Sequence, residues 1–63
     1  MKGYISFPHA KYWMGDKEGK RWVDTQSKAT VFKLIDAEKW LDMKDSQQEK
    51  TRAELGYKFI PLN

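Results

Sequence analysis

The fold is decided by the stretch Tyr12-Trp13-Met14-Gly15-Asp16-Lys17-Glu18-Gly19-Lys20-Arg21-Trp22-Val23-Asp24. Two runs rich in aromatic residues flank a polar segment closed by glycine. This pattern is typical of a β-hairpin, because bulky side chains favour strands and glycine supplies the backbone freedom that a turn needs. The stretch also brings two tryptophans into one hairpin, which indicates a surface built for binding.

Further strand patterns lie on both sides of this hairpin. We expect a first strand at Gly3–Phe7, and Pro8 is well placed for the turn that follows it. The second and third strands are predicted at Ala10–Met14 and Lys20–Asp24. A fourth strand or extended edge is predicted at Ala29–Phe32, and a closing strand at Tyr57–Leu62.

One helix is predicted between the fourth and the closing strand. It starts at Asp36, or a residue or two earlier, and ends before Gly56, which suits a left-handed cap. Its continuous face turns polar after Leu41 and comprises Ala37, Trp40, Leu41, Lys44, Gln48, Thr51 and Leu55. The run 46–49 fits a capping box, so a kink or a second helix start is also open there. The chain is thus predicted to be one α+β domain, residues 1–63, with an antiparallel sheet of three to five strands and one helix on one face.

Turn lengths predict which residues share a face of the sheet. A two-residue loop at Pro8-His9 pairs Tyr4 with Trp13, and a four-residue loop at Asp16 to Gly19 pairs Trp13 with Trp22. The face expected to take the helix then holds Ile5, Phe7, Ala10, Tyr12, Met14 and Val23. The other face holds Lys2, Tyr4, Ser6, Lys11, Trp13, Lys20, Trp22 and Asp24, and it exposes a row of three rings, Tyr4, Trp13 and Trp22.

A three-residue loop closed by Gly19 is the alternative for the second turn. It shifts the third strand by one residue, so that Trp22 joins the core beside Met14. It also turns Asp24 inward opposite Tyr12, and burying an unpaired carboxylate is costly. The sequence therefore favours the four-residue loop.

Composition argues against most enzyme chemistry. The chain has no cysteine and a single histidine, His9, which is expected to lie exposed in a turn. No nucleophile motif or phosphate-binding glycine loop is present. We therefore expect a protein that is not an enzyme and has no catalytic residues, metal site or cofactor. No apolar run follows Met1-Lys2, so neither a signal peptide nor a membrane segment is expected, and the predicted location is the cytoplasm.

Charge is divided unevenly along the chain, whose formal net charge is +3. Residues 36–54 carry six acidic and four basic side chains, a net charge of −2. The remainder carries eight basic and three acidic side chains, a net charge of +5. Positive charge therefore gathers on the strand-rich part, where it can steer an acidic partner.

Two kinds of partner fit the predicted surface, whose candidate binding residues are Tyr4, Lys11, Trp13, Lys20, Arg21 and Trp22. Tryptophan, tyrosine and arginine are enriched in protein-binding hot spots, which favours a protein or ribonucleoprotein. A flat sheet that carries aromatics among lysines also suits the stacking of single-stranded nucleic acid, which is the alternative.

The chain also resembles small proteins carried by phages and mobile elements. The resemblance follows the order Lys11-Tyr12-Trp13-Met14, Gly19-Lys20-Arg21-Trp22-Val23-Asp24, Ser27-Lys28-Ala29-Thr30-Val31-Phe32, then a helix and a closing strand. The run from Lys17 to Asp24 is similar to one hairpin of a type I-F anti-CRISPR protein. The resemblance implies a phage accessory protein that inhibits a host target, of anti-CRISPR or anti-defence type, by covering it rather than by chemistry.

Overall fold

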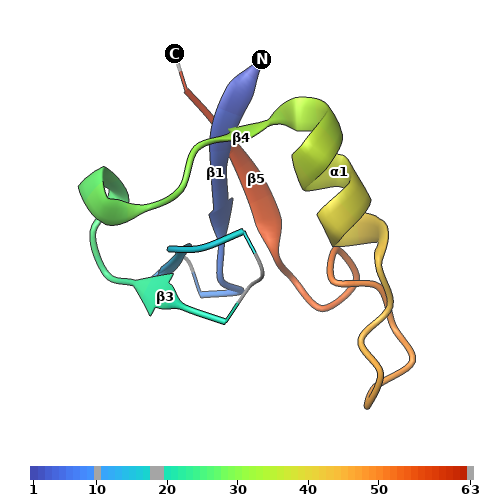
Figure 1. The fold of residues 1–63 in the computed structure, drawn as a ribbon. Helices are drawn as coiled ribbons and strands as arrows, with labels where there is room; N and C mark the ends of the chain where they lie inside the picture. Colours follow the sequence, from blue (N-terminus) through green and yellow to red (C-terminus); the bar gives the residue numbers. More distant parts are fainter. Residues whose placement is uncertain (10, 18–19, 63) are drawn as a thin grey trace.

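The computed structural model describes residues 1–9, 11–17 and 20–62. Within them the chain forms a five-stranded antiparallel sheet and one α-helix (Figure 1), which confirms the predicted α+β fold. The predicted strand start at Ala10 and the turn residues Glu18 and Gly19 lie outside the described residues. The elements are β1 (Lys2–Ser6), β2 (Trp13–Met14), β3 (Trp22–Val23), a 3-10 turn η1 (Gln26–Lys28), β4 (Phe32–Lys33), α1 (Leu34–Asp42) and β5 (Lys58–Pro61).

Strand β1 is the centre of the sheet and pairs with three other strands. One edge of β1 pairs with β5 along residues 3–6. The opposite edge is shared, since Ser6 pairs with Trp13 of β2 while Lys2 and Gly3 pair with β4. Strand β3 continues the sheet beyond β2. The first strand of the chain therefore pairs directly with three of the other four, and β3 joins the sheet through β2.

The segment before β4 is tied to the hairpin by Thr30. Its backbone N–H donates to the carbonyl of Met14 at 3.0 Å, and its hydroxyl donates to the carbonyl of Gly15 at 2.9 Å. These bonds hold β2 and the approach to β4 against each other along the same side of β1.

The core lies between the sheet and α1, as the face analysis predicts for Ile5 and Met14. Val23, expected on the same face, pairs with Trp13 and therefore lies on the other side of the sheet. The buried members of the core are Ile5, Met14, Phe32 and Ala37, and Trp22, Trp40, Leu41 and Phe59 pack against them. The helix begins at Leu34, within two residues of the predicted start, and its N-cap Lys33 makes no side-chain capping bond. The expected packing of the helix through Ala37, Trp40 and Leu41 is confirmed.

The first hairpin has a longer loop than the predicted two residues. Ser6 pairs with Trp13, and the N–H of Phe7 donates to the carbonyl of Tyr12 at 2.8 Å. The predicted pairing of Tyr4 with Trp13 is therefore wrong by two residues. Because side chains alternate with a period of two, this error leaves Tyr4 and Trp13 on the same side of the sheet.

The second hairpin adopts the register that the sequence analysis rejected. Trp13 pairs with Val23 and Met14 pairs with Trp22, so the predicted pairing of Trp13 with Trp22 is wrong by one residue. The objection to this register was the burial of Asp24, but Asp24 is exposed. Strand β3 ends at Val23 and the chain bends away, so Asp24 never enters the sheet.

The helix is shorter than predicted and ends at Asp42 rather than near Leu55. After the helix, the chain turns at Asp45. The Asp45 carboxylate accepts hydrogen bonds from the backbone N–H groups of Gln47 at 2.8 Å and of Gln48 at 3.2 Å. Such local side-chain bonds compete with helix formation. The run 46–49 forms a turn, with neither a kinked helix nor a second helix start, and residues 43–56 project from the body as an extended loop (Figure 1).

A reciprocal capping box does exist, five residues beyond the predicted one. The backbone N–H of Glu54 donates to the Thr51 hydroxyl oxygen at 3.2 Å, and the Thr51 N–H donates to the Glu54 carboxylate at 3.1 Å. That backbone bond, together with one from the Thr51 hydroxyl, lowers the pKa of Glu54. The single helical turn that follows closes at Gly56, whose φ of 103° confirms the predicted left-handed conformation.

No helix in the described ranges has the length and apolarity needed to span a membrane. In the same ranges, no three histidine or acidic side chains gather closely enough to hold a metal ion.

Candidate binding surface

The six predicted binding residues do not form one surface. Tyr4 and Trp13 share a side of the sheet, whereas Trp22 lies on the helix side, opposite Met14. The predicted row of Tyr4, Trp13 and Trp22 is therefore wrong, because the one-residue shift of β3 turns Trp22 over. Trp22 packs against the core instead of facing solvent. That any of these six residues contacts a partner stays a prediction.

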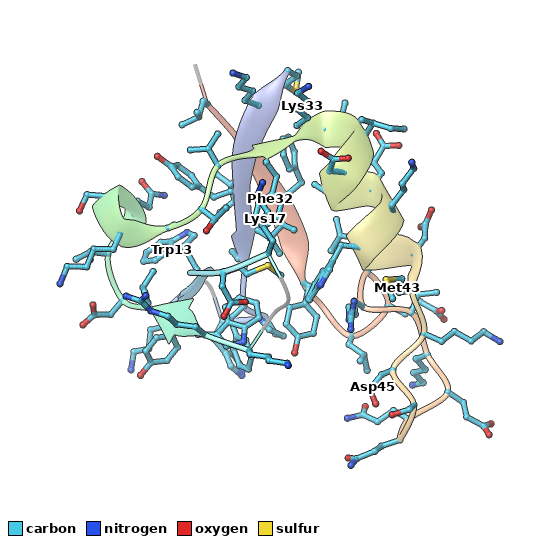
Figure 2. The ribbon with its side chains drawn as sticks, viewed as in Figure 1. Trp13, Lys17, Phe32, Lys33, Met43 and Asp45 are labelled. Carbon is cyan, nitrogen blue, oxygen red and sulfur yellow. The ribbon has the colours of Figure 1, made fainter. Side chains whose placement is uncertain are left out.

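Trp13 is also less available than the sequence suggests. It is half-buried, and its indole Nε1 is fully covered without a hydrogen-bond partner among the described residues. Figure 2 shows its side chain beside the hairpin on the side away from α1. The three predicted cations Lys11, Lys20 and Arg21 are exposed, as expected.

A different group of rings gathers on the helix side of the hairpin. We call it the aromatic cluster, and it consists of Phe7, Tyr12, Trp22, Trp40 and Tyr57. Phe7 is its centre, with ring centroids 4.9 Å from Trp22, 5.4 Å from Tyr57 and 6.4 Å from Tyr12. Trp40 closes the group at 5.4 Å from Tyr57 and 6.4 Å from Trp22.

The rings of the cluster meet mainly edge to face. The planes of Phe7 and Tyr57 are 89° apart, and those of Trp40 and Tyr57 are 81° apart. This geometry suits the ring quadrupoles, and it covers much of each ring face with a neighbouring ring. Four of the rings are half-buried, so that part of each side chain reaches solvent: Phe7, Trp22, Trp40 and Tyr57. Tyr12 is 45% exposed. Tyr12 was expected on the core face; it sits at that face's outer end.

Arg52 connects the projecting loop, residues 43–56, to the aromatic cluster. Its guanidinium carbon lies 4.0 Å from the centroid of the Trp40 ring, and its Nη1 donates to the Trp40 carbonyl at 3.4 Å. Its backbone N–H donates to the carbonyl of Met43, and its own carbonyl accepts the N–H of Tyr57. A cation at this place also complements the negative end of the helix dipole. Arg52 thus joins α1, the loop and the segment that leads into β5.

We expect Arg52→Ala to lower the free energy of unfolding by about 1–2 kcal/mol, from the lost cation–π contact and the lost charged donor. Arg52→Lys should lose less, since it keeps the charge and most of the stem. Arg21→Ala is the control, because Arg21 is exposed on the hairpin. Urea unfolding followed by circular dichroism measures all three, and equal stabilities for the two alanine variants would contradict this role.

Sequence reasoning missed Phe7, Tyr57, Trp40 and Arg52 as parts of a surface. They come from the end of β1, from α1 and from the loop, so no spacing within one segment reveals them. One signal was present in the sequence, namely the alternative hairpin register that places Trp22 beside Met14. In comparisons with known proteins, no family model, curated protein or solved structure matches this chain.

Proposed function

We propose that this protein is a non-enzymatic binding protein that uses the aromatic cluster to cover a surface of a protein partner. One observation carries the proposal: five rings meet at one end of the helix side, and none of them is fully buried. Tyr12 leaves 45% of its area in solvent there. Rigid aromatic side chains next to arginine are the typical anchors of protein interfaces.

The packing of the rings favours a protein partner over single-stranded nucleic acid. Base stacking needs an open ring face, but Trp40 is covered by Arg52 on one face and approached by Tyr57 nearly at right angles. Edges and a phenol hydroxyl remain available for contact. These suit the apolar pockets and hydrogen-bond acceptors of a folded protein surface better than stacked bases.

Charge indicates that the partner is acidic. Lys20 and Arg21 are exposed in the hairpin immediately before Trp22, and Lys11 is exposed immediately before Tyr12. Cations at the rim of an interface accelerate association with an acidic surface. The resemblance to phage accessory proteins supports a host protein as the target, bound in the host cytoplasm and inhibited because its surface is covered.

Variants of the exposed residues test this proposal without disturbing the core. Tagged protein is incubated with bacterial lysate, with and without nuclease treatment, and retained proteins are identified by mass spectrometry. We expect Tyr12→Ala to weaken retention about tenfold, as hot-spot tyrosines do, and Lys20→Glu with Arg21→Glu to slow association. The charge-matched control is Lys28→Glu with Lys58→Glu, at exposed positions in η1 and β5.

The outcomes separate the two classes of partner. Nuclease-resistant capture that Tyr12→Ala weakens and the control variant preserves supports a protein partner. Capture that disappears after nuclease treatment would instead favour the nucleic-acid alternative, with affinity falling linearly in log salt. Equal capture by all folded variants would move the binding surface away from the aromatic cluster.

A further inference from the structure

The face of the sheet that turns away from α1 carries a separate group of side chains. Ile5 pairs with Phe59 and Gly3 pairs with Phe32, and this side of the sheet holds the core and α1 (Figure 1). The residues next to these along each strand point the other way, because side chains alternate along a strand. We call this second group the open face, and it consists of Lys2, Tyr4, Lys33, Lys58 and Ile60.

Strand pairing places lysines at both ends of the open face. Lys2 is directly opposed to Lys33 near the start of β1. Lys58 is opposed to Ser6, at the end of β1. Four residue steps separate Lys2 from Ser6, a length of about 13 Å at the usual rise of a strand. Tyr4 lies midway, with two lysine positions at one end and one at the other.

The charged residues of the open face are all basic. Lys2, Lys33 and Lys58 are exposed, and none of them takes part in an ion pair within the part of the chain that the structure describes. Asp36 and Glu38 line hollows beside Lys2 and Lys33, but both belong to α1, which packs on the other side of the sheet. Like charges at directly opposed positions repel, so an anion bound at Lys2 and Lys33 relieves this repulsion.

Tyr4 is the aromatic residue at the centre of this face. It belongs to the central strand and is half-buried. Among the described residues, no other ring contacts Tyr4 and no group forms a hydrogen bond with its hydroxyl. Tyr4 therefore differs from the rings of the aromatic cluster, which cover one another. Toward the hairpin the same side of the sheet is covered, since Ser6 and Val23 are buried, so Tyr4 is the ring that a ligand can reach.

A chain of phosphates joined to bases fits this arrangement. Sheets that bind single strands stack bases on rings of their central strands and hold the backbone with surrounding cations. A small anion would reach the lysines at one end of the open face, whereas a polyanion reaches both ends. Its bases would meet Tyr4 between them.

We propose that the open face binds single-stranded nucleic acid, with a base against Tyr4 and phosphates at Lys2, Lys33 and Lys58. The aromatic cluster lies on the opposite side of the sheet, so neither this proposal nor the protein-binding proposal depends on the other. Of the binding residues predicted from the sequence, the open face retains Tyr4.

The test uses the purified protein and a fluorescein-labelled oligothymidylate of about ten nucleotides, which is within the usual size of such sites. Fluorescence anisotropy gives the affinity at several salt concentrations. Three phosphate contacts predict that log affinity falls with log salt with a slope of about −2, or roughly −0.7 per contact. A duplex of the same length should bind more weakly, because its bases are stacked inside the helix.

Two triple variants separate the open face from net charge. The first combines Lys2→Gln, Lys33→Gln and Lys58→Gln, and it should weaken binding at least about tenfold and bring the salt slope close to zero. The control, which removes the same charge from exposed positions on α1 and the projecting loop, combines Lys39→Gln, Lys44→Gln and Lys50→Gln. The control should keep the salt slope and most of the affinity, because screening limits the reach of exposed charges.

Variants of two tyrosines test the role of the ring. Tyr4→Leu should weaken binding about tenfold and leave the salt slope unchanged, because it removes base stacking and no charge. Tyr4→Phe keeps the ring and should retain most of the affinity. Tyr12→Ala, on the helix side, should leave the affinity for the oligonucleotide unchanged. Circular dichroism checks that each variant is folded.

Any of four results overturns the proposal. These are the absence of saturable binding at low salt, an equal loss of salt dependence in the two triple variants, equal affinity for the duplex, and full affinity in folded Tyr4→Leu. If Tyr4→Leu does not fold, the triple variants and the duplex still decide the outcome.

Discussion

Replacing Gly3 with alanine is expected to leave most of the protein unfolded. Gly3 is buried where β4, β1 and β5 lie side by side, and it pairs with both Phe32 and Pro61. A Cβ added here would press against the carbonyl oxygen of Ile60 and lie 2.6 Å from Cζ of Phe59. The carbonyl belongs to a paired backbone, so it cannot move without breaking the ladder between β1 and β5.

Whether Gly3→Ala lowers or raises the stability distinguishes a collision in the packed sheet from ordinary strand propensity. Without the collision, alanine would stabilise a strand by roughly 0.5–1 kcal/mol over glycine. We expect instead a loss of several kcal/mol, which is a large part of what a small domain possesses. Circular dichroism and urea unfolding measure the change.

Gly15→Ala is the matched control for Gly3→Ala. Its added Cβ would meet the side chain of Val23 at 2.9 Å, and a side chain can shift more easily than a paired backbone. Gly15→Ala should therefore fold with a smaller loss of stability. A folded Gly3→Ala variant as stable as the parent protein would show that β5 can move away from β1.

The parts of the fold that sequence predicts are those governed by local pattern. Alternation along residues 3–7 places Ile5 inward, and the spacing of Ala37, Trp40 and Leu41 gives the helix one apolar side. Both features are confirmed, because burial of a single continuous face is the main requirement on each segment. The closing strand is likewise found at Lys58–Pro61, within the predicted Tyr57–Leu62.

Two wrong predictions, the register of the second hairpin and the end of the helix, depend on interactions between residues that lie far apart in the chain. The hairpin register was judged from the cost of burying Asp24, yet the strands are so short that Asp24 stays outside the sheet. The helix was extended to Leu55 on spacing alone. Its carbonyl groups at Leu41 and Met43 are instead satisfied by the N–H groups of Ala53 and Arg52, which return from the far side of the loop.

The candidate surface depends on the same misjudged register. A shift of one residue moves Trp22 from a solvent-facing row into contact with Phe7, Trp40 and Tyr57. Composition correctly indicated that aromatic and basic residues concentrate on the hairpin. It could not indicate which rings meet, since the neighbours of Trp22 come from three separate segments.

Ile5→Ala is expected to lower the free energy of unfolding by about 2–5 kcal/mol. Ile5 is 0% exposed, and it is one of the two largest side chains that are fully buried in the described core. It lies at the centre of β1, where it pairs with Phe59 of β5, and it belongs to the buried cluster with Met14, Phe32 and Ala37. A cavity left here cannot collapse easily, which places the cost toward the upper part of the range.

The chain provides a matched control for this substitution. Ile35 is the same residue type in the first turn of α1, yet it is 57% exposed. Ile35→Ala should change stability by no more than about 0.5 kcal/mol, the usual size for surface substitutions. Ile5→Val should fall between the two, near 0.5–1.5 kcal/mol, because it removes one methyl group and keeps the branched shape. Equal effects of Ile5→Ala and Ile35→Ala in urea unfolding would mean that β1 is not the centre of the core, and the pairing of β1 with β2, β4 and β5 would then have to be rejected as well.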